Sequence, residues 1–272
     1  MDRIGKALIK AQQENKTRQG PNRGSRRHSR SLQKSHEPID ITYQQTRTKR
    51  VPPRVLAEQR VIAGQRGHPQ ADVYRILRTQ VLRRLGELGG NTVGICSPNA
   101  SDGKSLTAAN LAVSLSMVPT QTVLLVDLDL RRPDIHRHFG LSLENGLSDY
   151  LLGKRELSDC LIHPGIDRLV ILPAGKSLHY SSELLSSPKM EALVKDLKGR
   201  YPDRLIVYDL PPLLSSDDAL VFVPYIDGSI LVIREGKTRK REILRSLDIL
   251  QNFNFLGTIL NNSAEKYMDL YY

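Results

Sequence analysis

The sequence contains no tryptophan, and aromatic residues make up only 5% of its 272 residues. A protein that binds nucleic acid by stacking bases on aromatic side chains is therefore not expected, and we predict no specific nucleic-acid partner. The two cysteines, Cys96 and Cys160, lack the spacing of a metal site or a redox pair. This pattern is typical of two reduced thiols in a cytoplasmic protein.

Long apolar segments are also missing. No run approaches the roughly 18 to 20 residues that span a bilayer, and the N-terminus lacks the apolar core of a signal peptide. Positive charge, by contrast, is abundant and uneven: residues 1–60 carry 15 Lys and Arg against 5 Asp and Glu, whereas the rest carry 25 against 24. We expect a basic arm over residues 1–60, a domain over 61–262 and a short tail over 263–272.

The basic arm has two parts. Residues 1–15 place Ile4 and Leu8 on one face among basic residues, which is typical of a short amphipathic helix. Residues 16–37 are rich in Gly, Ser and Arg, and we expect them to be disordered. The charge of residues 1–37 predicts attraction to an anionic membrane surface. Docking on a partner helix, or a solvated arm, is the alternative for residues 1–15.

The stretch from Asn91 to Ser116 predicts a strand, a polar loop and a helix. Gly103, Lys104 and Ser105 stand where the loop meets the helix. A residue without a side chain lets backbone N–H groups approach a phosphate, a lysine reaches the β and γ phosphates, and a hydroxyl can ligate Mg²⁺. The alternative is an ordinary turn with a surface lysine, because the general phosphate-loop pattern has a glycine where this chain has Pro98.

Two later apolar runs end in carboxylates. The first, residues 122–132, predicts a buried strand that carries Asp127 and Asp129 at its carboxyl end. The second begins at residue 204 and ends at Asp209. Because ligands bind at the carboxyl ends of parallel strands, these acids suit Mg²⁺ binding and proton transfer. Alternatively, Asp127 caps a helix and Asp129 pairs with a neighbouring arginine.

The remaining patterns alternate between strand and helix. Strands are expected at residues 168–173, 229–233 and 256–260, and helices at residues 70–88, 182–198 and 238–250. This alternation predicts an α/β fold with a mainly parallel sheet and helices on both faces. In the first of these helices, Asp72, Arg75 and Arg78 recur every three residues. They form either a solvated, salt-bridged face or a contact between subunits.

The motifs SPNASDGKS, LLVDLDLRRP and LIVYDLPP, followed by a C-terminal tyrosine cluster, resemble in order and spacing the bacterial tyrosine kinases of capsular and exopolysaccharide synthesis. That family has a P-loop NTPase fold with Walker A, A′ and B strands, and the likeness covers about residues 60–272. The segment DVYRILR resembles the family's interface motif, with Asp72 in place of the usual glutamate. The segments DRIGKALIKAQQE and YQQTRTKR resemble the subgroup that accompanies exosortase-linked systems, where the kinase is separate from its membrane partner.

The resemblance implies a role for each matching position, with ATP and Mg²⁺ as cofactors. The catalytic residues would be Lys104, Asp127 and Asp129, with Asp127 accepting the proton of the tyrosine hydroxyl. Nucleotide-binding positions would be Ser101, Asp102, Gly103, Lys104, Ser105, Leu106 and the adenine-reading Asn261. Magnesium would be held by Ser105, Asp129 and Asp209, the phosphate acceptors would be Tyr267, Tyr271 and Tyr272, and the subunit contact would be formed by Asp72, Arg75 and Arg78.

The sequence therefore predicts an ATP-dependent tyrosine autokinase that assembles into a ring of copies and modifies the tails of its neighbours. The resemblance implies a membrane-embedded polysaccharide chain-length regulator and a cognate tyrosine phosphatase as partners, at the periphery of the inner membrane. In the loop, Ala100, Ser101 and Asp102 replace the usual Pro-Gly-Glu. If that glycine has a positive φ, Ser101 is strained. The alternatives are an ATP-binding scaffold without phosphotransfer and a partitioning-type ATPase.

Overall fold

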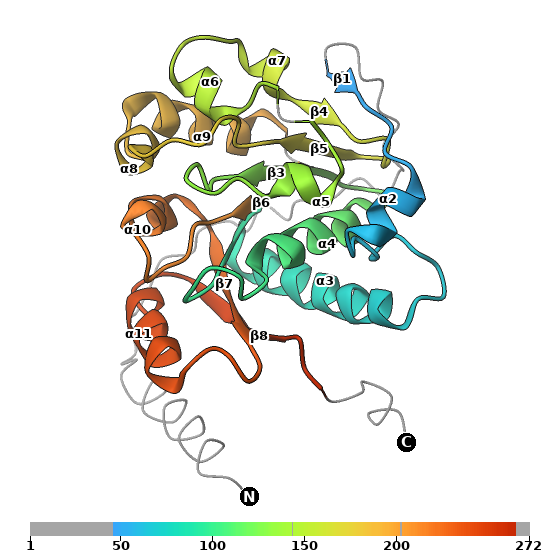
Figure 1. The fold of residues 1–272 in the computed structure, drawn as a ribbon, viewed down its shortest axis with the longest axis vertical. Helices are drawn as coiled ribbons and strands as arrows, with labels where there is room; N and C mark the ends of the chain where they lie inside the picture. The colour runs from blue at the N-terminus through green and yellow to red at the C-terminus, as the bar shows by residue number, and fades with distance from the viewer. Residues whose placement is uncertain (1–45, 143, 202, 265–272) are drawn as a thin grey trace, which may run out of the picture. The chain divides into compact units, whose positions relative to one another are not determined.

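The structure is a computed structural model that describes residues 46–142, 144–201 and 203–264 (Figure 1). The predictions for residues 1–45 and for the tyrosines Tyr267, Tyr271 and Tyr272 lie outside these ranges. Within them, no helix has the length and apolarity required to cross a membrane.

The described chain is built on one eight-stranded sheet in the order β1-β4-β5-β3-β6-β2-β7-β8. Its strands pair in parallel, except that β4 and β5 are antiparallel. The predicted α/β fold with a mainly parallel sheet is confirmed. The strands are β1 (Arg47–Thr48), β2 (Thr92–Cys96), β3 (Thr122–Asp127), β4 (Ile162–His163), β5 (Leu169–Leu172), β6 (Arg204–Asp209), β7 (Gly228–Arg234) and β8 (Phe255–Asn261).

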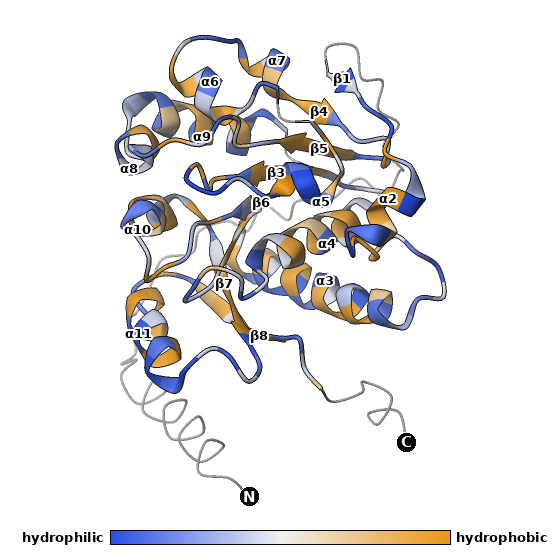
Figure 2. Cartoon of the chain, in the orientation of Figure 1, coloured by the Kyte–Doolittle hydropathy of each residue, from blue (hydrophilic) through white to orange (hydrophobic). Residues whose placement is uncertain are grey.

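Helices cover both faces of the sheet (Figure 1). Side chains of β3 alternate: Leu124 and Val126 belong to one apolar cluster, whereas Val123 and Leu125 belong to the other. Strand β3 is accordingly buried on both sides. Figure 2 shows hydrophobic residues along this and other strands of the sheet. The second cluster packs against α3 (Pro69–Leu88) and α4 (Lys104–Ser116). The first packs against α8 (Ser181–Leu185), α9 (Pro188–Arg200), α10 (Asp218–Phe222) and α11 (Lys240–Leu250).

The single helix expected over residues 182–198 is wrong, because the chain forms two helices there, α8 and α9. Pro188 stands at the start of α9 and has no N–H to continue the preceding helix. The Ser187 hydroxyl accepts a hydrogen bond from the backbone N–H of Met190 at 3.2 Å, which caps the new helix. The hydrophobic spacing continues across the break, so periodicity alone did not reveal it.

The segment ahead of α3 packs on the domain. Backbone N–H groups of Lys49 and Val51 donate to carbonyls of His163 and Pro164, and α2 (Pro53–Glu58) follows. The buried Asn110 side chain then accepts from the backbone of the next segment, residues 62–63, at 2.8 and 3.0 Å. The domain boundary expected at residue 60 therefore falls inside a segment that is held to the sheet. The remaining short elements are α5 (Ile135–His138), α6 (Leu147–Leu151), α7 (Leu157–Cys160) and the 3₁₀ turn Val223–Tyr225.

Candidate active site

The loop between β2 and α4 ends in a glycine with a backbone conformation that residues with a side chain rarely adopt. Gly103 has φ +100°, in the region that favours glycine. A Cβ atom at this position would lie 1.9 Å from the side-chain nitrogen of Asn261, so a larger residue would displace that side chain. Ser101 also has a positive φ, +67°, which is the condition under which strain was expected at this position.

Lys104 lies at the centre of the candidate site. Its ammonium is 3.0 Å from a carboxylate oxygen of Asp129 and 3.5 Å from one of Asp209, and the side chain is buried. The predicted lysine and two of the predicted acids thus converge from α4, from the turn after β3 and from the end of β6. Burial opposes the charged form of Lys104, but the negative charges of Asp209, Asp129 and Asp127 outweigh it and raise its pKa.

Asp209 has the features expected of a magnesium ligand. One of its carboxylate oxygens, Oδ2, is buried and has no hydrogen-bond partner among the described residues. Burial raises the pKa of Asp209, although Lys104 and a hydrogen bond from Ser105 act against this rise. Carboxylate and hydroxyl oxygens suit Mg²⁺, which takes one or two protein carboxylates together with substrate phosphates. Asp209, Asp129 and Ser105 therefore fit the ion.

In the described ranges, no cluster of three His, Cys, Asp or Glu side chains is arranged as a self-sufficient metal site. A structural metal centre is built entirely from protein ligands, and the described residues hold no such cluster. Mg²⁺ usually keeps several waters and phosphate oxygens as ligands. The few oxygen ligands that Ser105, Asp129 and Asp209 offer are compatible with an ion of this kind.

Asp127 is fully buried and has an additional structural role. Its carboxylate accepts hydrogen bonds from the backbone N–H groups of Asp129 at 3.1 Å and of Asp134 and Ile135 at 3.2 Å. These contacts hold the start of α5, which is the helix-capping alternative that the sequence left open. Burial, followed by the nearby Asp209, raises the pKa of Asp127 well above its usual value. The carboxylate is thus fixed in place with a raised affinity for a proton.

The phosphate loop is braced from the C-terminal part of the chain. The Asn261 side chain donates to the Asp102 carbonyl at 2.9 Å, and Arg234 donates to the Ser101 carbonyl at 3.3 Å. Asn99 donates to the Glu242 carboxylate at 3.0 Å. The sequence singled out Asn261 for reading adenine rather than for this contact. It gave no sign of Arg234 or Glu242, because both follow the loop by more than a hundred residues and carry no local motif.

Two further loop residues are placed by the structure. One oxygen of the buried Asp102 carboxylate accepts from the backbone N–H of Asn99 at 3.0 Å, and the other has no partner among the described residues. Leu106 lies on the first turn of α4 and is partly buried. Both residues lie within two positions of Lys104 in the chain, and their binding of nucleotide stays a prediction.

The motif on α3 does not behave as one exposed edge. Asp72 and Arg75 form an ion pair within the helix, and the Asp72 side chain is well exposed. Arg78 instead donates to the backbone carbonyl of Ser114 in the last turn of α4 at 2.9 Å. Burial, followed by the charge of Arg75, lowers the pKa of Arg78. Within the chain, Arg78 therefore fastens α3 to α4, while Asp72 and Arg75 face outward.

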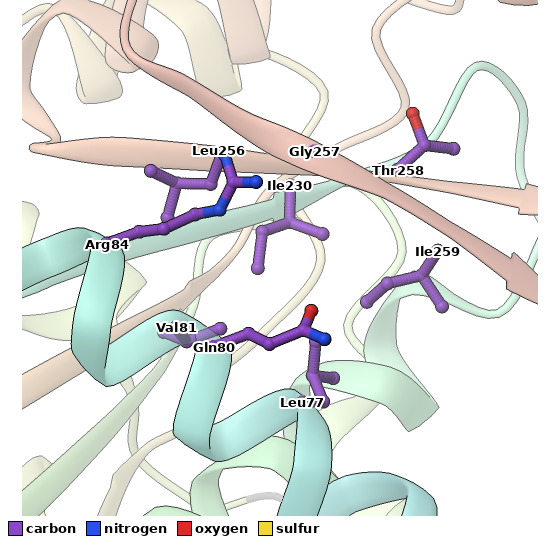
Figure 3. A pocket seen from close by; sticks show the side chains of 9 residues that line it. All are labelled: Leu77, Gln80, Val81, Arg84, Ile230, Leu256, Gly257, Thr258 and Ile259. Carbon is purple, nitrogen blue, oxygen red and sulfur yellow. The ribbon is translucent and has the colours of Figure 1, made fainter.

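A groove separate from the lysine and its acids lies between α3 and the last two strands (Figure 3). Its volume is about 250 Å³, and it is lined by Leu77, Gln80, Val81, Arg84, Ile230, Leu256, Gly257, Thr258 and Ile259. No residue predicted to bind nucleotide is among them. The groove is therefore distinct from the phosphate site.

Comparison with known proteins supports the kinase resemblance. The chain is 34% identical over 193 residues to the tyrosine-protein kinase YwqD of Bacillus subtilis, which covers 70% of the chain and 80% of YwqD. The solved kinase domain of Escherichia coli ETK matches with a TM-score of 0.71 and 30% identity, over 82% of the chain and 85% of that domain. No family model matches the sequence.

A second solved structure, from outside the tyrosine kinases, has a similar fold. The septum site-determining protein MinD of Pyrococcus horikoshii, complexed with Mg-ADP, matches with a TM-score of 0.55 and 27% identity, over 65% of the chain and 72% of MinD. The predicted P-loop NTPase fold is thereby supported, and the kinase relatives disfavour the partitioning-type alternative. The chain spans 27% of the length of the full tyrosine-protein kinase Etk of Escherichia coli K12, to which it is 32% identical over 197 residues. With its similarity to YwqD over most of both proteins, the chain belongs to the bacterial tyrosine-protein kinases.

Proposed function

We propose that this chain transfers the γ-phosphate of ATP to tyrosine, and that Tyr267, Tyr271 and Tyr272 of neighbouring copies are the acceptors. The observation that carries the proposal is the position of the Lys104 ammonium, within 3.5 Å of both Asp129 and Asp209 at the start of α4. A cation and two acids at the end of a phosphate loop suit the transfer of a phosphoryl group. Membership of the tyrosine-protein kinase family supports the same reaction.

Each residue of the site has a physical task in this reaction. When bound, ATP with Mg²⁺ supplies the phosphoryl group and a cation that neutralises its developing charge. Lys104 and the backbone N–H groups at the start of α4 orient the phosphates. Ser105, Asp129 and Asp209 hold the ion, and the unpaired oxygen of Asp209 is available for a water or the metal itself.

Asp127 is the proposed acceptor of the tyrosine proton. A phenol with a pKa around 10 transfers its proton most readily to a base of raised affinity, and burial raises the pKa of Asp127. Three backbone N–H groups keep the carboxylate in position. A carboxylate has about four lone-pair sites, so these contacts leave it capacity for a proton.

The wider role that we propose is control of exopolysaccharide polymerisation or export. A membrane-embedded chain-length regulator would be the partner, and a tyrosine phosphatase would reverse the modification. Ring-like assembly of copies would use Asp72 and Arg75, which face outward on α3. The basic residues 1–37 would keep the protein at the cytoplasmic side of the inner membrane. A further solved relative, the chimerical protein CapA2B2, matches at 25% identity with a TM-score of 0.71.

Purified protein incubated with Mg-ATP and probed with an anti-phosphotyrosine antibody tests the proposal. We expect a time-dependent signal from the wild type and none from Asp209→Asn, which keeps the volume of the side chain but removes its charge. A thermal melt of both proteins shows whether the variant is folded. A wild type that binds ATP but gains no phosphotyrosine would favour the scaffold alternative.

A further inference from the structure

A dense group of cations lies next to the phosphate loop, on the turn after β7 and on α11. Its members are Lys237, Arg239, Lys240, Arg241 and Arg245, which we call the basic surface. All five residues are exposed, and none forms an ion pair with another residue of the described chain. Lys240 and Arg241 belong to the first turn of α11, where the partial positive charge of a helix disfavours cations. Five exposed cations without an ion pair in the described chain thus lie within residues 237–245.

The acidic residues closest in sequence to the basic surface already have partners. A Glu242 oxygen accepts from the backbone N–H of Arg239 at 2.8 Å and from Asn99 at 3.0 Å. Glu235 accepts from the backbone N–H of Ala264 at 2.6 Å. Asp248 is exposed beyond the last member of the group, on the same helix. The five cations of the basic surface thus outnumber the nearby acids, two of which are already engaged in hydrogen bonds.

The contact between Glu235 and Ala264 shows that the end of the described chain lies near the basic surface. It fixes Ala264, the residue that precedes the tyrosine-bearing tail of residues 265–272, beside the turn that carries Lys237. The backbone N–H of Glu235 also donates to the Asn261 carbonyl at 3.0 Å, so the tail leaves β8 at a defined place. Lys240 is five residues from Glu235, a span of at most about 18 Å. Eight residues reach about 26 Å when extended, so the tail can cover this distance.

We propose that the basic surface holds the phosphorylated tail of its own subunit. This inference rests on the proposed function, because it needs phosphate on Tyr267, Tyr271 or Tyr272. Each phosphate adds a charge of about −1.5 to −2 and three strong acceptor oxygens, which arginine and lysine bind in charge-assisted hydrogen bonds. The unmodified tail has only Glu265 and Asp269 against Lys266. Phosphorylation therefore converts a weakly acidic segment into a ligand for the five cations.

Binding of the phosphorylated tail to the basic surface would set the order of events in the assembly. A tail that is held on its own subunit is withdrawn from the active site of the neighbouring copy. The basic surface would then act after transfer and leave the neighbouring site open for the next tail. Effective concentration favours this intramolecular contact, because the tail is anchored at Ala264 within a short reach of the surface.

Peptide binding to the full chain tests the inference. The protein carries Lys104→Met, so that its own tail stays unmodified, and the probe is a labelled peptide of residues 264–272 with phosphate on Tyr271 and Tyr272. We expect the phosphopeptide to bind about tenfold or more tightly than the unmodified peptide, with an affinity that falls as salt rises. Adding Lys240→Glu with Arg241→Glu removes this preference. The matched control, Lys154→Glu with Arg155→Glu, changes two exposed cations on a distant loop and keeps it.

Two results would overturn the inference. One is equal binding of the phosphopeptide to the charge-reversed and control proteins. The other is loss of binding to phosphatidylserine vesicles in the charge-reversed protein with no change in peptide affinity, which would assign the surface to a membrane. Because the peptide is phosphorylated by synthesis, its binding does not depend on kinase activity. Failure of the proposed kinase function would instead be seen as a missing phosphotyrosine signal in the wild type.

Discussion

The side-chain amide of Asn261, at the end of β8, donates a 2.9 Å hydrogen bond to the backbone carbonyl of Asp102 in the phosphate loop. The same amide nitrogen occupies the space that a side chain at Gly103 would need. The last strand of the sheet therefore fixes the conformation of a loop that lies more than 150 residues earlier in the chain. This contact also gives Asn261 a task that does not involve the adenine base.

Asn261→Ala should weaken the binding of ATP and GTP to the same extent. Loss of one hydrogen bond that orders the loop corresponds to about 0.5–1.5 kcal/mol, or roughly a two- to tenfold rise in the dissociation constant. Titration calorimetry with both nucleotides measures the effect, with the exposed β8 residue Thr258→Ala as the control. A loss confined to ATP would show instead that Asn261 reads the adenine base.

Ser101→Gly should stabilise the protein and raise its turnover. Ser101 has φ +67°, and this conformation destabilises a residue with a Cβ atom by about 1 kcal/mol or more. Urea unfolding should show a gain of about 1 kcal/mol, and phosphotyrosine should accumulate faster. Ser101→Ala is the control, because it removes the hydroxyl but keeps the Cβ atom. Equal behaviour of the glycine and alanine variants would exclude backbone strain as the cause.

Substitutions of Arg75 and Arg78, the two arginines of the α3 motif, should have different effects. Arg78→Ala removes the donor to the Ser114 carbonyl and should lower the free energy of unfolding by about 1–2 kcal/mol. Arg75→Ala removes only an exposed pair with Asp72 and should leave stability within about 0.5 kcal/mol of the wild type while it weakens assembly. Thermal melts and light scattering after gel filtration measure both quantities. A monomeric wild type at high concentration would contradict the proposed contact.

Asp227, at the amino-terminal edge of the sheet, should make the stability of the protein depend on pH. Its carboxylate accepts from Asn91 and Thr92 and pairs with Lys198. Burial opposes ionisation, but these hydrogen bonds outweigh it and lower the pKa of Asp227 below 3.8. A lowered pKa means that the contribution is present above about pH 3.8, the value in the unfolded chain, and is lost as the pH falls below it.

Asp227→Asn should therefore cost about 1–3 kcal/mol of unfolding free energy at pH 7. The difference from the wild type should shrink as the pH falls below about 4, because protonation removes the same charge. Urea unfolding at a series of pH values measures this difference. A constant gap between the two proteins down to pH 3 would refute the assigned role of the carboxylate.

Much of the central fold could be predicted from the sequence, because a strand that is buried on both faces leaves a continuous apolar run. The runs before Pro98, at residues 122–127 and at residues 204–209 each became a central strand. Asp129 and Asp209 could be singled out because they lie at the carboxyl ends of such runs, and Lys104 because a short polar loop joins it to the first run. The two-residue strands β1 and β4 were not predicted, because their pairing depends on distant segments.

The contacts that brace the site were less accessible to prediction. The helix-capping role of Asp127 was one of two alternatives, and only the position of α5 shows that the carboxylate accepts three backbone N–H groups. The inward contact of Arg78 depends on how α3 lies against α4. Residue spacing predicts which side chains share a face of a helix. It does not predict which neighbouring element that face packs against.

Mass spectrometry of the intact and digested protein after incubation with Mg-ATP tests the central claim most directly. The comparison includes wild type, Lys104→Met and a variant with Tyr267, Tyr271 and Tyr272 all changed to Phe. The account predicts phosphate on the C-terminal peptide of the wild type and on neither variant at that position. Wild-type protein that binds ATP and carries no phosphate, or phosphate that persists in Lys104→Met, would contradict it.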